Sequence, residues 1–173
     1  MDADLSGLRS LVEEVARRTG SGAVDLSDGH ARWAVYRRAM DEPAEWGPLL
    51  EIVGLEPDPS IAMSVVLQML ERVPAPERTS WAERISAEQQ RPLAELRVRE
   101  LRILDAMAGP ESEDHAPTPV EVSQWSDWLQ RRVSEVSTSS SVLDQLSQSG
   151  RTKRVRNLST ERLRALRRGG PPR

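Results

Sequence analysis

Hydrophobic residues recur every three or four positions along most of the chain, the spacing that an amphipathic helix requires. The first such series runs from Leu5 to Val15, and Gly20 and Gly22 then follow as a typical helix stop. No segment alternates β-branched and aromatic residues with polar ones in the manner of a strand. The pattern therefore predicts an all-α protein, an irregular bundle or short stack of about six to eight helices.

The segment from Ile61 to Val73 carries the strongest helical signal, because apolar residues occupy nearly its whole circumference. Asp58 and Pro59 precede it, which predicts a capping carboxylate followed by proline at the first helical position. We expect this helix to lie at the centre of the core. The side chains that we expect to be most deeply buried are Val66, Met69 and Leu70.

Residues 46–73 have a helix–turn–helix layout. A short amphipathic stretch begins at Trp46, a turn follows over residues 54–59, and an apolar segment then ends at Val73. Prolines at the starts of predicted helices recur at intervals of 33 and 43 residues, at Pro43, Pro76 and Pro119. Residues 46–73 therefore resemble one unit of a HEAT-type helical repeat, whose period is about 40–47 residues. The resemblance implies HEAT-like helix pairs in a scaffold that binds partners on its surface.

The match departs from the HEAT family early in the second helix. A basic residue is usual there, whereas this chain has Met63 and Ser64. An irregular bundle of helix pairs is therefore the alternative to a true repeat array.

Charge divides the chain more sharply than hydrophobicity does. Residues 1–58 carry 12 acids and 6 bases, residues 111–150 carry 7 acids and 2 bases, and residues 151–173 carry one acid and 9 bases. We therefore predict a helical domain over residues 1–150 and a basic C-terminal tail over residues 151–173. Few apolar residues accompany these cations, so the tail is expected to be mobile.

The basic segment is a candidate binding element for nucleic acid, an acidic protein or an anionic surface, because clustered cations neutralise phosphates without regard to sequence. No aromatic residue interleaves with its cations, so stacking on bases is not expected within it. A passive end that touches its own acidic domain is the alternative. The candidate contact residues are Arg151, Lys153, Arg154, Arg156, Arg162, Arg164, Arg167 and Arg168.

Five tryptophans stand at apolar-face positions, and core packing is the expected role for most of them. Trp125 and Trp128 are three residues apart, so a single helix would place them on adjacent turns of one face. If a tryptophan contacts a partner, this pair is the candidate.

Residues for catalysis or metal binding are sparse. The chain has no cysteine and only two histidines, His30 at a helix start and His115 in an acidic stretch that we expect to be a solvated loop. No phosphate-binding glycine loop, zinc-protease motif or nucleophile elbow is present. The sequence therefore predicts a non-enzymatic protein without a cofactor or metal. The acidic N-terminal sequence and the lack of a long apolar run predict a cytoplasmic protein.

Together these observations favour a protein-interaction module, that is, an adaptor, accessory or regulatory protein that acts through a helical surface. The alternative is a nucleic-acid-associated protein that binds phosphates through the Arg-rich C-terminal segment. The partner itself is not specified by the sequence.

Overall fold

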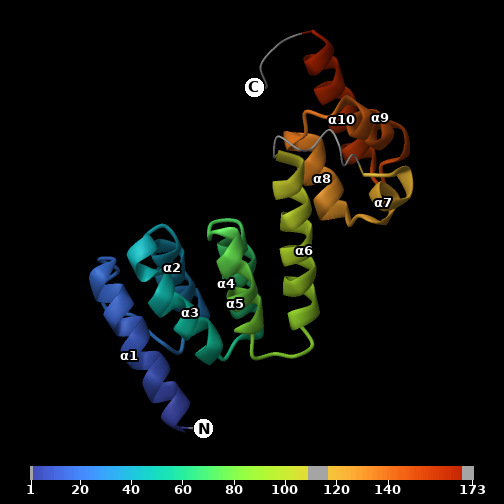
Figure 1. The fold of residues 1–173 in the computed structure, drawn as a ribbon. Coiled ribbons are helices and arrows are strands. Elements are labelled where there is room, and N and C mark those ends of the chain that lie inside the picture. Colours follow the sequence, from blue (N-terminus) through green and yellow to red (C-terminus); the bar gives the residue numbers. More distant parts are fainter. Residues whose placement is uncertain (1, 109–116, 169–173) are drawn as a thin grey trace. The chain divides into compact units, whose positions relative to one another are not determined.

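A computed structural model describes residues 2–108 and 117–168, and every regular element in these ranges is helical (Figure 1). The ten α-helices among the described residues are somewhat more numerous than expected, and two short 3₁₀ turns, η1 and η2, lie between them. None of the described helices is both long and apolar enough to cross a membrane. In chain order the elements are α1 (Asp2–Arg18), α2 (Gly29–Met40), η1 (Pro43–Glu45), α3 (Trp46–Leu55), α4 (Pro59–Leu70), η2 (Ala75–Glu77), α5 (Arg78–Glu83), α6 (Arg91–Ala108), α7 (Pro119–Gln124), α8 (Asp127–Val136), α9 (Ser140–Ser149) and α10 (Lys153–Arg167).

Helical spacing of apolar residues from Val122 to Val136 predicts one continuous helix, but this segment belongs to two helices in the structure, which adds one to the helix count. Trp125 adopts an extended conformation with φ −62° and ψ 143°, which ends α7. The side chain of Ser126 then accepts a hydrogen bond from the backbone N–H of Leu129 and caps α8. The sequence Thr118-Pro119-Val120-Glu121 predicts a capping box, and the structure contains it at the start of α7.

The contacts within the chain group into two compact units, residues 1–101 (unit 1) and residues 102–173 (unit 2). This division differs from the expected boundary at residue 150. The reason is that most of the expected tail forms α10, which packs against α8 and α9 and buries Val155 and Leu163. The expected solvated loop around His115 and the last five residues of the expected tail lie outside the described residues.

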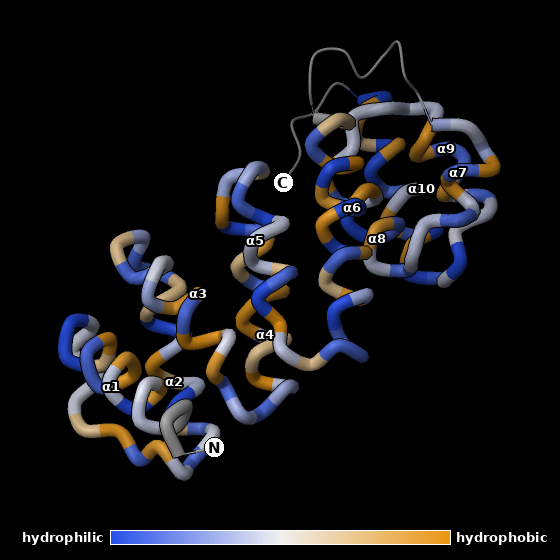
Figure 2. Tube along the Cα trace, turned by 60° about the horizontal axis from the view of Figure 1, so that its bottom comes forward, coloured by the Kyte–Doolittle hydropathy of each residue, from blue (hydrophilic) through white to orange (hydrophobic). Residues whose placement is uncertain are grey.

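In unit 1 the helix with the strongest apolar signal has the buried position that was predicted for it. Val66, Met69 and Leu70 of α4 are completely buried, and α4 contacts α2, α3 and α5. Figure 2 shows hydrophobic positions along α4. Its predicted cap is also present, because the Asp58 carboxylate accepts hydrogen bonds from the backbone N–H groups of Ser60 and Ile61 at 2.8 and 3.3 Å.

Two ion pairs with buried carboxylates tie the helices of unit 1 together. The guanidinium of Arg32 on α2 donates two hydrogen bonds, at 3.1 and 2.7 Å, to the carboxylate of Glu56 at the end of α3. Arg18 on α1 donates two similar bonds, at 2.8 and 2.9 Å, to Glu45 of η1. Both carboxylates are buried, and paired two-point contacts of this kind offset the cost of removing a charge from water.

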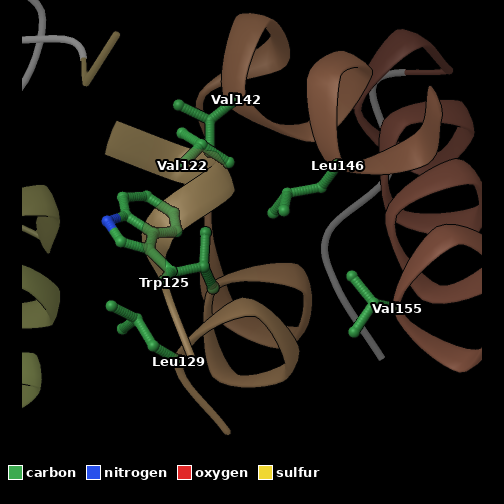
Figure 3. Packing of buried hydrophobic residues seen from close by; sticks show 7 residues of the cluster. Val122, Trp125, Leu129, Val142, Leu146 and Val155 are labelled. Atoms are coloured by element: carbon green, nitrogen blue, oxygen red, sulfur yellow. The ribbon is translucent and has the colours of Figure 1, made fainter. Parts of the chain in front are cut away.

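Unit 2 has its own hydrophobic core, to which α7, α8, α9 and α10 all contribute. Figure 3 shows the indole of Trp125 between Val122 and Leu129. Partly buried hydrophobic side chains from the end of α6 and from Trp128 pack against this cluster. The buried members are Val122, Trp125, Leu129, Val133, Val142, Leu146 and Val155.

Buried polar side chains fix α10 to the rest of unit 2. Ser134 of α8 and Ser159 of α10 are both buried, and their hydroxyl oxygens lie 2.8 Å apart. The side-chain oxygen of Gln130 accepts a hydrogen bond from the backbone N–H of Arg151 at 2.9 Å, and its amide donates to the carbonyl of Val122 at 3.1 Å. These bonds hold the start and the middle of α10 in place.

Candidate functional site

The basic helix α10 has one face against the core and one face toward solvent. Val155, Ser159 and Leu163 are buried and lie four residues apart, so they form one stripe along the helix. The exposed positions are mostly charged. The helical period therefore directs most of the cations of this segment outward.

Three of the eight candidate cations have structural partners within unit 2. Arg156 donates a hydrogen bond to the carbonyl of Gly150 at 2.6 Å, and Arg162 donates one to the carbonyl of Ser137 at 3.1 Å. Arg151 lies 3.7 Å from the carboxylate of Asp127. The first two arginines thus fasten α10 to neighbouring turns, and because their partners are carbonyls they keep their full positive charge.

The other five candidate cations are exposed, and none has an acidic partner within 4 Å among the described residues. Glu161 is the one acidic residue of α10 itself. The helix rises about 1.5 Å per residue, so these cations are distributed over about 22 Å. The five residues are Lys153, Arg154, Arg164, Arg167 and Arg168, and we call them the outer basic face.

The structure separates the two tryptophans that the sequence analysis grouped as a candidate pair. Trp125 is only 6% exposed and belongs to the core, whereas Trp128 is half-buried. The break at Ser126 is the reason, because residues on either side of it do not share one helical face. The guanidinium carbon of Arg132 lies over the Trp128 ring, 5.9 Å from its centroid.

A shallow hollow of about 290 Å³ lies beside Trp128, between the first turns of α8 and α10. It joins an aromatic side chain to a cation of the outer basic face, although Trp128 and Arg154 are 26 residues apart in the sequence. The basic segment itself contains no aromatic residue, so its sequence predicts no stacking on bases there. The packing of α8 against α10 places an aromatic side chain from outside the basic segment beside one of its cations. The hollow is lined by Asp127, Trp128, Arg131, Thr152, Arg154 and Val155.

Titratable groups elsewhere in the described ranges do not form a metal centre. No three histidine, aspartate or glutamate side chains of these ranges gather closely enough to hold an ion. His30 is exposed in the first turn of α2. The buried acids Glu45 and Glu56 are engaged with arginines, and Glu100 lies 3.2 Å from Arg97. Among the described surfaces, the outer basic face with its hollow is therefore the best candidate site, and its chemistry is suited to binding an anion.

Comparison of the chain with models of protein families, with curated proteins and with solved structures finds no match.

Proposed function

We propose that this chain is a non-enzymatic binding protein that attaches to nucleic acid through the outer basic face of α10. The observation that carries the proposal is that five exposed cations lie on a helix fixed to the core of unit 2, without acidic partners in the described ranges. A fixed array of arginine and lysine matches the regular spacing of backbone phosphates better than a mobile tail does, because less side-chain and chain entropy is lost on binding.

The distribution of charge between the two units supports this choice. Residues 102–173 carry 12 bases and 9 acids, whereas residues 1–101 carry 18 acids and 12 bases. A polyanion is attracted by unit 2 and repelled by unit 1, so it is directed to one part of the chain. Contacts of this kind go to phosphates and are insensitive to base sequence.

Fluorescence anisotropy with the full-length protein and a labelled 30-base-pair DNA duplex, over a range from 50 to 200 mM salt, tests the proposal. If all five cations contact phosphates, log K should fall with log salt with a slope of about −4.5. The triple substitution R164Q, R167Q and R168Q should reduce this slope to about −1.8. Absence of binding at 50 mM salt would overturn the proposal.

A matched control removes three exposed arginines from unit 1 instead. The triple substitution R9Q, R37Q and R99Q changes the net charge by the same amount, so a general effect of charge would appear equally in both variants. We expect the control to retain or slightly improve binding, because unit 1 is already acidic.

A second candidate function is a scaffold for protein partners, and the stacking of helices in unit 1 favours it. α1 contacts α3, and α2 contacts α4, so elements two apart in the chain lie against each other. HEAT-like pairing has this alternating arrangement, and such arrays bind partners on an extended surface. A protein partner of this surface should still bind to the R164Q, R167Q and R168Q variant at 200 mM salt. If the variant no longer binds that protein partner, the binding site for the partner lies on α10 instead.

A further inference from the structure

We infer that the middle of α10 enters the major groove of double-stranded DNA, where Asn157 and Glu161 contact base edges and give the protein a sequence preference. The inference rests on the proposed function, because the outer basic face must hold the phosphates that border the groove. It goes further by naming the form of the nucleic acid and the two side chains that distinguish its bases.

Charge is distributed unevenly along the outer side of α10. At 3.6 residues per turn, the outer basic face, Asn157 and Glu161 fall within about 140° of the helix circumference, on the side away from the buried stripe. Lys153 and Arg154 precede Asn157, and the other three cations follow Glu161. The outer side is therefore basic at both ends of the helix and uncharged or acidic in the middle.

Asn157 and Glu161 are free to contact a ligand. Both are exposed, and neither has a hydrogen-bond or ion-pair partner in the described ranges. They are four residues apart, so they lie on adjacent turns of one face, separated by about 6 Å along the helix axis. This separation is close to two base steps of about 3.4 Å each.

The chemistry of the two side chains matches the donor and acceptor pattern of the major groove. An asparagine amide pairs with N6 and N7 of adenine, and a glutamate carboxylate accepts a hydrogen bond from N4 of cytosine. On a face that bound phosphates alone, the carboxylate of Glu161 would oppose binding by repulsion. Its place between two groups of cations is explained if the cations contact the backbones and Glu161 faces the bases.

The turn before α10 holds this helix closely against α9. Only Gly150, Arg151 and Thr152 separate the two helices. A Cβ at position 150 would lie 2.5 Å from the carbonyl oxygen of Leu146 and 2.6 Å from Cγ1 of Val155, so the close approach requires glycine. Two packed helices joined by a turn of this length form the layout in which the second helix of a DNA-binding motif enters the major groove.

α10 also fits the major groove in size. An α-helix with its side chains is about 10–12 Å across, and the groove is about 12 Å wide. Among the described residues, α8 and α9 pack against α10, and its buried stripe lies away from the outer basic face. The outer side can therefore approach DNA without rearrangement of unit 2.

Selection from a pool of duplexes tests the inference. The full-length protein is incubated at 50 mM salt with 30-base-pair DNA duplexes that carry 12 random central positions, and the bound duplexes are amplified and sequenced. We expect enrichment of duplexes with an adenine and a cytosine about two base steps apart. Replacing that adenine in a selected duplex should weaken binding by about 5- to 150-fold, the discrimination of one two-point base contact. Replacing the cytosine should weaken binding by a smaller factor.

Two substitutions assign these preferences to side chains. Asn157→Ala should abolish the preference for adenine and leave that for cytosine. Glu161→Gln should replace the preference for cytosine by one for adenine, because a glutamine amide pairs with N6 and N7 of adenine. The loss of a negative charge should not weaken binding of unselected duplexes, which also shows that the variant is folded. The matched control is Glu95→Gln, which removes an exposed carboxylate from α6 and should leave both preferences unchanged.

The outcomes separate the base contacts from the phosphate contacts. Binding of the pool without enrichment of such an adenine and cytosine, or preferences that survive both substitutions, would overturn the inference and leave the proposed function standing. Tighter binding of a 30-nucleotide oligo-dT than of the duplex pool would also overturn the inference, because a single strand has no groove. Failure of the unaltered protein to bind either probe would overturn the inference and the proposed function together.

Discussion

The hydroxyl of Tyr36 donates a hydrogen bond of 2.7 Å to Oε2 of Glu56, and neither residue is more than 4% exposed. Arg32 pairs with the same carboxylate through two further bonds, and Oε1 of Glu56 also accepts from the backbone N–H of Asp58 at 3.0 Å. These bonds join α2 to the turn between α3 and α4. The buried carboxylate therefore accepts four hydrogen bonds.

This arrangement gives a direct prediction for the ionisation of Tyr36. The pKa of Tyr36 is raised well above its ordinary value of about 10. Burial is the largest cause, and the hydrogen bond to the negatively charged Glu56 is the second. Tyr36 is the single tyrosine of the chain, so absorbance at 295 nm reports on it alone. We expect no ionisation near pH 10 in the folded protein, and ionisation near pH 10 in 6 M guanidinium chloride.

The same shift makes stability fall at alkaline pH. Tyr36 remains neutral in the folded state, whereas the unfolded chain loses this proton near pH 10. The stabilisation is therefore fully present below pH 10 and declines as the pH rises above that value. A tyrosinate signal near pH 10 with an unchanged far-ultraviolet spectrum would contradict the burial of this hydroxyl.

The second prediction concerns the core of unit 1. Leu70 is completely buried in α4, so Leu70→Ala should lower the free energy of unfolding by about 2–5 kcal/mol. Leu93→Ala is the matched control, because Leu93 is 47% exposed and its truncation leaves no cavity. Chemical denaturation measures both changes. A loss below about 0.5 kcal/mol for Leu70→Ala would mean that α4 is not a core helix.

The third prediction separates capping from charge at the start of α4. Asp58→Ala removes the acceptor for the N–H groups of Ser60 and Ile61 and should cost about 0.5–2 kcal/mol. Asp58→Asn keeps an acceptor oxygen and should cost much less. Equal losses in thermal unfolding of the two variants would show that Asp58 acts through its charge on the helix dipole.

The fourth prediction concerns the attachment of α10. Gln130→Met preserves the volume of a buried side chain but leaves the N–H of Arg151 and the carbonyl of Val122 without this partner. Loss of such bonds at a largely buried position should cost about 1–3 kcal/mol. Gln148→Met on the exposed face of α9 is the control and should change stability by less than about 0.5 kcal/mol. Comparable losses from the two variants would argue against Gln130 as an anchor of α10.

The apolar pattern of α6 shows where sequence periodicity stops being informative. Helical spacing predicts one apolar face for Leu93, Leu96 and Leu101, yet Leu101 is buried while Leu93 and Leu96 are 47% and 37% exposed. Ala94 and Val98 take the buried positions nearby. Periodicity identifies the helix, but the neighbouring elements decide which of its apolar residues are covered.

The sequence alone determined the all-α class, the buried character of α4 and the caps at Asp58 and Thr118, because helical periodicity and capping depend on residues within one or two turns. The break at Ser126 escaped prediction, since an apolar series continues on both sides of it.

Only the tertiary structure determined that the basic segment is a packed helix. Its few apolar residues suggested a mobile tail, but Val155, Ser159 and Leu163 find partners on α8 and α9 and hold α10 in place. The same packing brings Trp128 beside Arg154. Contacts between residues 26 positions apart depend on how the intervening helices pack, and local hydrophobic spacing does not determine that packing.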